Sequence, residues 1–430
     1  MRLAALLVSS VLWSQQYFSV PPDDAPQLAS WGNHQIGVKT FDLVNKDQID
    51  ILKFNQESKQ APKADRSLKV EVWYPAEIPS GQKADTVYEG VTRSGMKFQT
   101  AGKALRDAAA EAGGQHFPLV IVSHGYPGSR IIMSYLGENL ASKGYVVASI
   151  DHTDSVLGDI KGFQSTLLNR TADQLFVIDA VSAAMSNIVD RDRVAVIGYS
   201  MGGYGALATS GAGYSKSAGF LRMMPGGYMD RWTAGNPEYL ERMKALKGRL
   251  KAVVAIAPWG MQPPMESWDA ESMKGLVIPS LFIVGDQDDI SGYEKGVKRA
   301  FEAAVKSERC MLVYENARHN VGANPRPPGV ALNPGDREFF EEPVWRKDRL
   351  MAVQAHFITA FLDRYVKGDA AKAAYIDGLT PNSNDGIWPG LSPGRHAEYS
   401  PGPPVATLWK GFQPNKAAGM SFEFKAAGRE

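Results

Sequence analysis

The sequence predicts an α/β protein with a mostly parallel central sheet and helices on both faces. Between residues 117 and 366, short continuous apolar runs alternate with helical segments. A continuous apolar run suits a strand buried on both faces, and the intervening helices supply the crossovers that parallel strands need. The segment 67–74 instead alternates apolar with polar residues, as a strand of an antiparallel edge does. We therefore expect one α/β domain with an antiparallel edge on its N-terminal side.

The individual elements follow from the same patterns. A strand is expected at 36–44, an antiparallel edge or near-edge strand at 67–74, and a short surface helix in the alanine-rich segment 101–112. Strands of the parallel sheet are expected at 118–122, 144–150, 194–197, 252–256, 277–284 and 311–314. Helices are expected at 129–142, 172–188, 202–209, 293–305 and 345–366.

The chain divides by composition into a leader, a domain and a tail. Residues 1–20 contain one positive charge and an apolar core of about 11 residues, which suits a secretory signal and is too short to cross a membrane. The alternative is a short apolar segment that packs on the domain. The α/β domain is expected to cover 21–369, with the Pro- and Gly-rich extension 370–430 packed on its surface. We expect a secreted or periplasmic protein without an integral membrane segment.

Charge and cysteine content exclude several classes of partner and site. The chain has 47 basic and 46 acidic residues, a net charge of +1, so nucleic acid is not an expected partner. Its single cysteine, Cys310, excludes an intrachain disulfide and a metal site built from thiolates. The run Asp151-His152-Thr153-Asp154 contains metal-ligand types, but no further spaced cluster completes a site. We therefore expect no bound metal.

The stretch around Ser200 carries the strongest functional pattern. Four apolar residues, 194–197, precede Gly198-Tyr199-Ser200-Met201-Gly202, and a helical segment follows. This is the G-x-S-x-G pattern of a nucleophile elbow, in which a sharp strand-to-helix turn exposes the serine hydroxyl and small residues flank it. The pattern alone is weak in a chain with 42 glycines, so its place between a strand and a helix carries the prediction.

A nucleophilic serine needs a base and the base needs an orienting acid, which follow the serine in the order acid, histidine on such a fold. The acid candidates come directly after the fifth expected parallel strand. We favour Asp288, which lies three residues beyond a glycine, with Asp286 as second choice. His319 follows the next strand, whereas His356 lies inside the last helix and His396 in the tail. Order and loop position therefore select His319 as the base.

Two backbone N–H groups are expected to bind the oxyanion that forms when a serine attacks an acyl carbonyl. One belongs to Met201, at the start of the helix after Ser200. The other belongs to Tyr126, in the glycine-rich turn after the strand 118–122, a turn that His124 is expected to support.

The segment 210–250, rich in glycine and methionine, lies after the helix that follows Ser200. At this position of a doubly wound sheet an insertion can overhang the carboxyl ends of the strands, where ligands bind. We expect a flexible apolar cap over an apolar substrate. An ordinary surface excursion is the alternative.

Several of these stretches together resemble a known family. They are Ser123-His124-Gly125-Tyr126, the helix end 139–144, Asp151-His152 and 198–203, and they are similar to the platelet-activating factor acetylhydrolase-like, dienelactone-hydrolase-related branch of the α/β-hydrolases. The resemblance is clearest from 118 to 205 and extends to His319. It implies an α/β-hydrolase fold, a serine esterase that uses no cofactor, and Tyr126 as an oxyanion donor. True dienelactone hydrolases have a cysteine in place of Ser200, so their substrate does not follow.

We therefore expect a serine carboxylic-ester hydrolase with Ser200, Asp288 and His319 as its catalytic triad, and Tyr126 and Met201 as oxyanion donors. The expected substrate is a short-acyl or lipid-like ester. Two alternatives stay open, namely amide or peptide hydrolysis by the same residues and a hydrolase fold that only binds its ligand.

Overall fold

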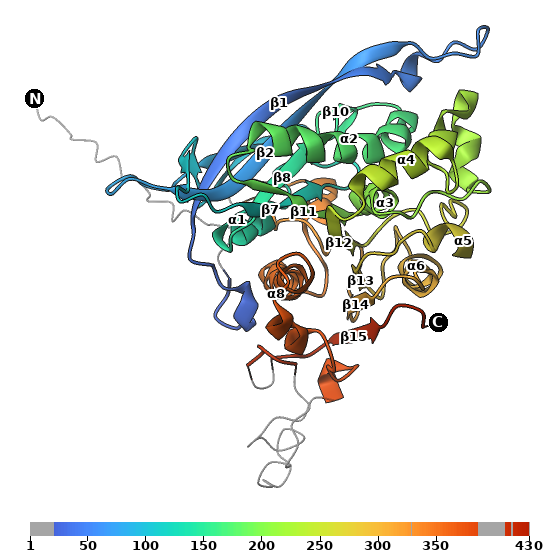
Figure 1. Ribbon diagram of the computed structural model, residues 1–430. Helices are drawn as coiled ribbons and strands as arrows, with labels where there is room; N and C mark the ends of the chain where they lie inside the picture. Colours follow the sequence, from blue (N-terminus) through green and yellow to red (C-terminus); the bar gives the residue numbers. More distant parts are fainter. Residues whose placement is uncertain (1–20, 328, 386–408, 414–415, 430) are drawn as a thin grey trace, which may run out of the picture.

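The computed structural model describes residues 21–327, 329–385, 409–413 and 416–429. The expected leader 1–20 and His396 therefore lie outside the described residues. An 11-stranded sheet runs through the described part, with helices on both faces (Figure 1). Its parallel portion has the order β14 (Arg309–Tyr314), β13 (Ser280–Gly285), β12 (Leu250–Ile256), β11 (Val189–Tyr199), β7 (Phe117–Ser123) and β8 (Val146–Asp151). The predicted mostly parallel sheet is thus confirmed.

Antiparallel strands flank the parallel portion on both sides. On one side, β2 (Lys63–Glu77) pairs with β8, and β1 (Gln35–Ile49) pairs with β2 to form the long ribbon at the top of Figure 1. This is the antiparallel edge predicted for the N-terminal side. On the other side, β15 (Met420–Lys425) pairs with β14, a strand that the composition of the C-terminal extension did not indicate.

The prediction of a surface helix at 101–112 is wrong. The segment contains β5 (Leu105–Arg106), which pairs with β1, and β6 (Ala109–Ala110), which pairs with β2. Alanine is a strong helix former, but helix propensity is a small energy, and hydrogen bonds to the free backbone groups of β1 and β2 override it.

Each parallel strand sends alternate side chains into two separate hydrophobic cores. In β7, Leu119 and Ile121 pack on the side of α2 (Phe163–Ala184) and α3 (Met201–Thr209), whereas Val120 and Val122 pack on the side of α1 (Ser134–Ser142) and α8 (Lys347–Tyr365). This burial on both faces explains the continuous apolar runs in the sequence. It also leaves the loops at the carboxyl ends of the strands as the place where a ligand can bind.

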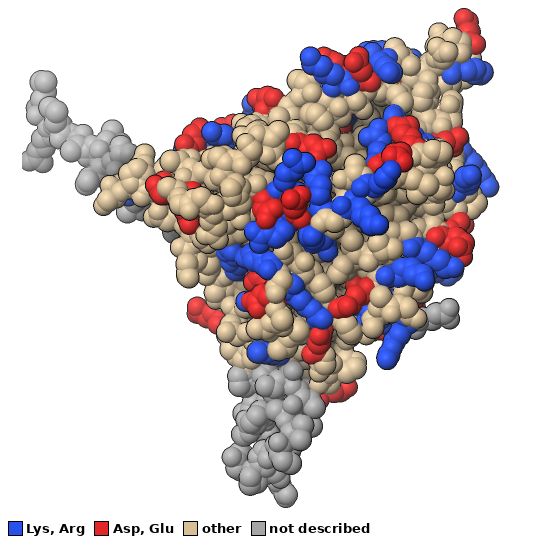
Figure 2. All heavy atoms as spheres, viewed as in Figure 1, with Lys and Arg blue, Asp and Glu red and all other residues tan. Residues whose placement is uncertain are grey.

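The remaining elements are short and lie before, between or after the strands of the 11-stranded sheet. They are η1 (Gln27–Ala29), η2 (Ile51–Lys53), β3 (Val87–Val91), β4 (Lys97–Ala101), β9 (Ser155–Val156), β10 (Asp159–Ile160), η3 (Gly219–Met223), η4 (Pro225–Trp232), α4 (Pro237–Leu246), α5 (Ala270–Met273), η5 (Tyr293–Lys298), α6 (Arg299–Ala303), α7 (Pro334–Phe340), η6 (Ala370–Tyr375) and η7 (Ser383–Asp385). On the face in Figure 2, basic and acidic side chains are interspersed, in keeping with the net charge of +1. No helix of the described residues has the length and apolar character needed to cross a membrane.

Candidate active site

Ser200 lies in a strained turn between β11 and α3. Its backbone angles are φ 54° and ψ −116°, in a region that residues other than glycine seldom adopt. The two glycines of the pattern make this turn possible. A Cβ atom at Gly202 would lie 1.9 Å from the carbonyl oxygen of Ser123, and one at Gly198 would lie 2.2 Å from the carbonyl oxygen of Gly202. No side chain therefore fits at either position without moving the backbone that holds Ser200.

The structure brings Ser200, His319 and Asp288 into one chain of hydrogen bonds. His319 Nε2 lies 2.9 Å from Ser200 Oγ, and His319 Nδ1 lies 2.9 and 3.0 Å from the two carboxylate oxygens of Asp288. A carboxylate can only accept, so Nδ1 carries the hydrogen and Nε2 is free to accept the serine proton. The backbone N–H groups of Ile290 and Ser291 also donate to Asp288 Oδ1, at 2.9 and 2.8 Å, which fixes the carboxylate.

The other carboxylates and histidines named from the sequence lie elsewhere. Asp286 Oδ1 accepts a hydrogen bond from the backbone N–H of Asn316 at 2.7 Å and does not contact His319. His356 is fully buried in α8, where it accepts from the N–H of Leu28 at 3.1 Å and burial lowers its pKa to about 3.

Tyr199 supports the histidine from the strand side. Its ring stacks on the His319 ring at 5.5 Å between centroids, and its hydroxyl donates to the His319 carbonyl oxygen at 3.2 Å. Burial, together with the nearby charge of Asp288, raises the pKa of Tyr199, so the hydroxyl keeps its proton and remains a donor. The sequence identified Tyr199 only as the variable position before the serine.

The two predicted oxyanion donors belong to segments next to Ser200, one following it in the chain and one in the loop after β7. Met201 is the first residue of α3, where a backbone N–H has no partner inside the helix. Tyr126 follows Gly125, whose added Cβ would lie 3.2 Å from the Ser200 Cβ, so this loop approaches the serine closely. Within residues 21–327, 329–385, 409–413 and 416–429, no acceptor is hydrogen-bonded to the N–H of Tyr126 or of Met201.

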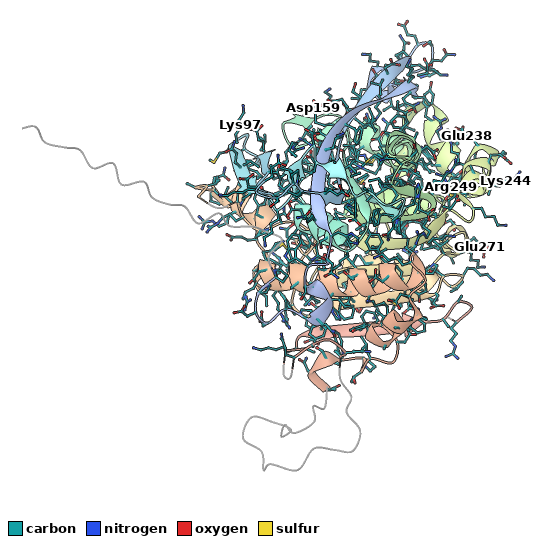
Figure 3. The ribbon with its side chains drawn as sticks, turned by 60° about the vertical axis from the view of Figure 1, so that its left-hand side comes forward. Lys97, Asp159, Glu238, Lys244, Arg249 and Glu271 are labelled. Atoms are coloured by element: carbon teal, nitrogen blue, oxygen red, sulfur yellow. The ribbon has the colours of Figure 1, made fainter. Side chains whose placement is uncertain are left out.

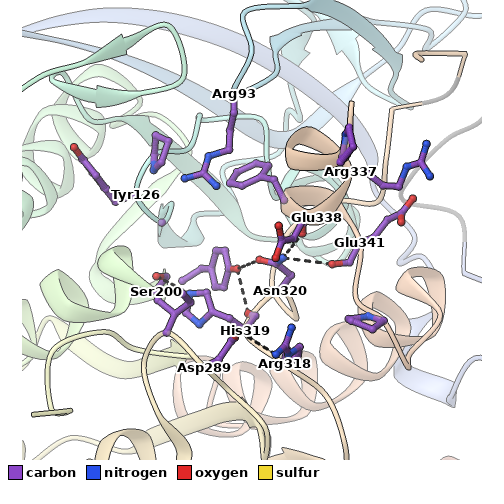
Figure 4. A pocket seen from close by; sticks show the side chains of 17 residues that line it. Arg93, Tyr126, Ser200, Asp289, Arg318, His319, Asn320, Arg337, Glu338 and Glu341 are labelled. Atoms are coloured by element: carbon purple, nitrogen blue, oxygen red, sulfur yellow. Dashed lines mark hydrogen bonds and ion pairs between the residues drawn. The ribbon is translucent and has the colours of Figure 1, made fainter. Parts of the chain in front are cut away.

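Ser200 and His319 open into a cavity of about 590 Å³ (Figure 4), a size usual for small-molecule sites. Tyr126, Tyr199 and Phe339 supply aromatic walls. Arg93 comes from the turn between β3 and β4, and its guanidinium points into the cavity in Figure 4.

The segment 210–250, which was expected to cap the substrate, does not lie over this cavity. No residue of the segment 210–250 lines this cavity; the segment instead packs on α2 and α3, where Trp232 Nε1 donates to the carbonyl oxygen of Leu168 at 2.9 Å. Figures 1 and 3 place it across the molecule from the β3–β4 hairpin, with Glu238 and Lys244 on one side and Lys97 on the other. Several of its large apolar residues, namely Phe220, Met229 and Trp232, belong to the core, which is why a composition-based prediction mistook them for a substrate cover.

The outer wall of the cavity is built by α7 and the β3–β4 hairpin. Asp336 of α7 accepts from the N–H of Ser94 at 3.0 Å and from the Ser94 hydroxyl. Phe98 of the hairpin packs edge-to-face on Phe340 at 6.0 Å between centroids. Pro334 and the Asn333 side chain, which accepts from the N–H of Asp336, begin α7. The Asn-Pro helix start is a local pattern that indicates α7. No local pattern indicated that the β3–β4 hairpin packs against this helix.

The run 151–154 is occupied by ion pairs rather than arranged around an ion. Asp151 binds Arg130 and Asp154 binds Arg66 at 3.0 Å. Within the described parts of the chain, no group of three or more His, Cys, Asp or Glu side chains has an arrangement that could hold a metal ion.

Comparison with known proteins agrees with this fold. Residues 102–220 match the family described as PET hydrolase-like, a stretch that includes Tyr126 and Ser200 but neither Asp288 nor His319. Cutinase est1 of Thermobifida alba is 26% identical over 201 residues, which are 46% of this chain and 52% of that protein. Dipeptidyl aminopeptidase BIII of Pseudoxanthomonas mexicana is 32% identical over 151 residues, or 34% of this chain and 20% of that protein.

The chain thus spans about half the length of the cutinases it matches. Among solved structures, the ferulic acid esterase from Streptomyces cinnamoneus has a TM-score of 0.53 and 21% sequence identity, covering 83% of this chain and 94% of that one. The predicted α/β-hydrolase fold is confirmed. The chain therefore has an α/β-hydrolase fold, and within it residues 102–220 are similar in sequence to PET hydrolase-like proteins.

Proposed function

We propose that the protein hydrolyses carboxylic esters through a Ser200–His319–Asp288 triad and an acyl-enzyme. The observation that carries the proposal is the hydrogen-bonded sequence from Asp288 through His319 to Ser200 Oγ, with Ser200 and His319 lining an open cavity. The similarity to cutinases and to a ferulic acid esterase supports an ester rather than another acyl compound.

In the proposed reaction, Ser200 Oγ attacks the ester carbonyl carbon while its proton moves to His319 Nε2. The resulting tetrahedral oxyanion accepts hydrogen bonds from the N–H groups of Tyr126 and Met201. His319 returns the proton to the leaving alcohol, and the acyl group remains on Ser200. A water molecule then attacks the acyl carbon and gives its proton to His319. The bond between that carbon and Ser200 Oγ breaks, His319 returns the proton to Oγ, and the acid leaves. Asp288 holds the imidazole tautomer and stabilises the imidazolium.

The proposed substrates are short-acyl esters and exposed ester groups of lipids or polymers. The cavity has room for a small acyl or aromatic group, and Tyr126, Tyr199 and Phe339 offer ring faces to pack against. Cutin and PET are candidate polymers and feruloyl esters candidate small substrates, given the names of the similar proteins. Initial rates on p-nitrophenyl esters from acetate to decanoate, on ethyl ferulate and on PET film rank these classes.

The triad is tested by replacing the nucleophile. Ser200→Ala is expected to lower turnover of p-nitrophenyl acetate by on the order of 10⁴-fold or more. A fluorophosphonate probe is expected to label the wild-type protein on Ser200 and not to label the variant. Ser217→Ala, at an exposed serine outside the cavity, serves as the matched control and retains full activity. Equal activity of Ser200→Ala and wild type overturns the proposal, and absence of labelling in wild type favours a binding protein.

Amide or peptide hydrolysis is the second candidate, favoured by the similarity to dipeptidyl aminopeptidase BIII. The same residues suffice, because His319 can protonate a leaving amine as well as an alcohol. Paired assays on p-nitrophenyl acetate and p-nitroacetanilide, which share the acyl group, distinguish the two. Faster turnover of the anilide reverses the assignment.

We further propose that residues 1–20 direct export and are removed, that 21–369 form the catalytic domain, and that 370–430 stabilise it from outside. Support for the last point comes from β15, which covers the edge of β14, and from Trp409, which is 1% exposed. The mass of the exported protein tests the first point. Truncation after residue 369 tests the last and is expected to lower the melting temperature.

A further inference from the structure

A second Ser–His–Asp arrangement lies beneath the loop that carries Tyr126. Ser123 Oγ lies 2.8 Å from His152 Nε2, and His152 Nδ1 lies 2.9 Å from Asp173 Oδ2. All three residues are at most 1% exposed, so no ester can reach this serine. Ser123 is the last residue of β7 and directly precedes His124, Gly125 and Tyr126. The arrangement is therefore placed to hold a loop rather than to cleave a substrate.

The charges around this arrangement fix the hydrogen positions on His152. Arg66 donates to both oxygens of Asp173, at 2.8 and 2.9 Å. Burial alone would raise the pKa of Asp173, but Arg66 and His152 outweigh it and lower the pKa to about 2. Burial and the charge of Arg170 lower the pKa of His152 to about 3. Neutral His152 therefore donates from Nδ1 to the carboxylate and accepts at Nε2 from the Ser123 hydroxyl.

The same histidine determines the tautomer of His124. The backbone N–H of His152 donates to His124 Nε2 at 3.3 Å, so that nitrogen must carry no hydrogen. Burial and the charge of Arg170 lower the pKa of His124 well below its usual value, so the ring is neutral and its hydrogen is on Nδ1. His124 Nδ1 lies 2.7 Å from the carbonyl oxygen of Gly125 and donates to it.

The Gly125 carbonyl and the Tyr126 N–H belong to one peptide group. The bond between Gly125 and Tyr126 is trans, so the carbonyl and the N–H point in opposite directions. A donor that holds the carbonyl from beneath the loop therefore turns the N–H toward the opposite side, where Gly125 approaches Ser200. The preceding peptide is held in the same manner, because Arg170 Nη1 donates to the His124 carbonyl oxygen at 2.7 Å.

We propose that His124 is a positioning residue for the oxyanion site: its Nδ1–H holds the Gly125–Tyr126 peptide in the orientation that presents the Tyr126 N–H, and the Ser123–His152–Asp173 arrangement maintains His124 in that tautomer. The proposal rests on the esterase function proposed above. A hydrogen bond to the carbonyl also polarises the peptide and strengthens the N–H as a donor. A histidine suits this position because one side chain must donate at one nitrogen and accept at the other.

Two substitutions at His124 distinguish the hydrogen bond that it donates to the Gly125 carbonyl from a role as a packed side chain. The amide nitrogen of Asn can occupy the place of Nδ1 and donate to Gly125, whereas the longer Gln reaches the place of Nε2 and leaves Gly125 without its donor. His124→Gln is expected to lower kcat by about 10- to 100-fold, within the limit for losing one oxyanion donor, and to change KM by less than about threefold. His124→Asn is expected to keep kcat within about fivefold of wild type.

The inhibition constant of a transition-state analogue tests the oxyanion site directly, because a purely structural role of His124 would not change it in step with kcat/KM. The hydroxyl oxygen of Ser200 adds to a trifluoromethyl ketone and forms a hemiketal oxyanion at the site where Tyr126 is proposed to donate. Its inhibition constant should rise in His124→Gln by the same factor by which kcat/KM falls. Wild-type kcat in His124→Gln, or equal losses in Gln and Asn variants that melt like wild type, overturns the proposal.

The wild-type protein provides a further test that does not depend on how the variants fold. Nitrogen-15 NMR of the imidazoles is expected to find neutral His124 with hydrogen on Nδ1, and the opposite tautomer overturns the proposal. If the wild type hydrolyses no ester and takes no fluorophosphonate, the proposed function fails. If wild type is active and His124→Gln is equally active, only this inference fails.

Discussion

Replacing Asp288 by Asn changes one atom and is expected to reverse the hydrogen positions on His319. Asp288 Oδ1 accepts from the N–H groups of Ile290 and Ser291, so the Asn oxygen is held there and the NH₂ group takes the place of Oδ2. That group then lies about where Oδ2 was, 2.9 Å from His319 Nδ1, and donates to it. Oδ1 also lies 3.0 Å from Nδ1, but it already accepts from two backbone N–H groups, so we expect Nδ1 to lose its hydrogen to the facing NH₂ donor. Nε2 then carries the hydrogen and can no longer accept the Ser200 proton.

The expected cost is a loss of kcat of about 10³- to 10⁴-fold, or about 4–5 kcal/mol of transition-state stabilisation. The assay is turnover of p-nitrophenyl acetate at pH 8, with urea unfolding to establish that the variant folds. Asp286→Asn is the matched control. Asp286 accepts from the N–H of Asn316, its one side-chain hydrogen bond among the described residues, and an Asn oxygen can accept it too, so activity is expected to stay within about threefold. A larger loss in Asp286→Asn than in Asp288→Asn would refute the reasoning.

Three further predictions concern the elbow, the cavity wall and acid stability. Gly202→Ala places a Cβ 1.9 Å from the Ser123 carbonyl oxygen, so the elbow must move by more than an ångström and kcat should fall by about 10²-fold or more; a kcat within threefold of wild type would count against this geometry. Phe339→Ala is expected to raise KM for ethyl ferulate severalfold, whereas Met223→Ala, in the segment first expected to cap the substrate, should leave KM unchanged. A larger rise in KM for Met223→Ala than for Phe339→Ala would show that the segment 210–250 does contact the substrate. His356, with a pKa of about 3 in the fold and about 6.5 in the unfolded chain, binds a proton only on unfolding between these pH values, so it lowers the free energy of unfolding by about 1.4 kcal/mol per pH unit as the pH falls. Urea unfolding at pH 6 and 4.5 should show a shallower pH dependence for His356→Phe than for wild type, and equal slopes would contradict it.

Much of the fold could be predicted because its patterns are local. Residues Leu119 to Val122 are apolar without interruption because alternate side chains enter two different cores, and a short window of sequence records that burial. The turn at Ser200 also depends on nearby residues, because a Cβ at Gly198 would clash with the carbonyl of Gly202, only four positions away. The segment 101–112 was mispredicted because it pairs with distant strands, and even its nearest paired residues, Glu77 and Ala109, are 32 positions apart along the chain.

The sequence by itself indicated the alternation of buried strands and helices, the elbow at Ser200, and the loops that carry Asp288 and His319. Only the tertiary structure decided which carboxylate contacts His319, because Asp286 and Asp288 differ in where a loop turns and not in their chemistry. It alone also decided what walls the cavity. Ser94 and Asp336 are 242 residues apart in sequence and meet through one pair of hydrogen bonds. Local patterns report how a segment is buried, whereas a cavity depends on which distant segments come into contact.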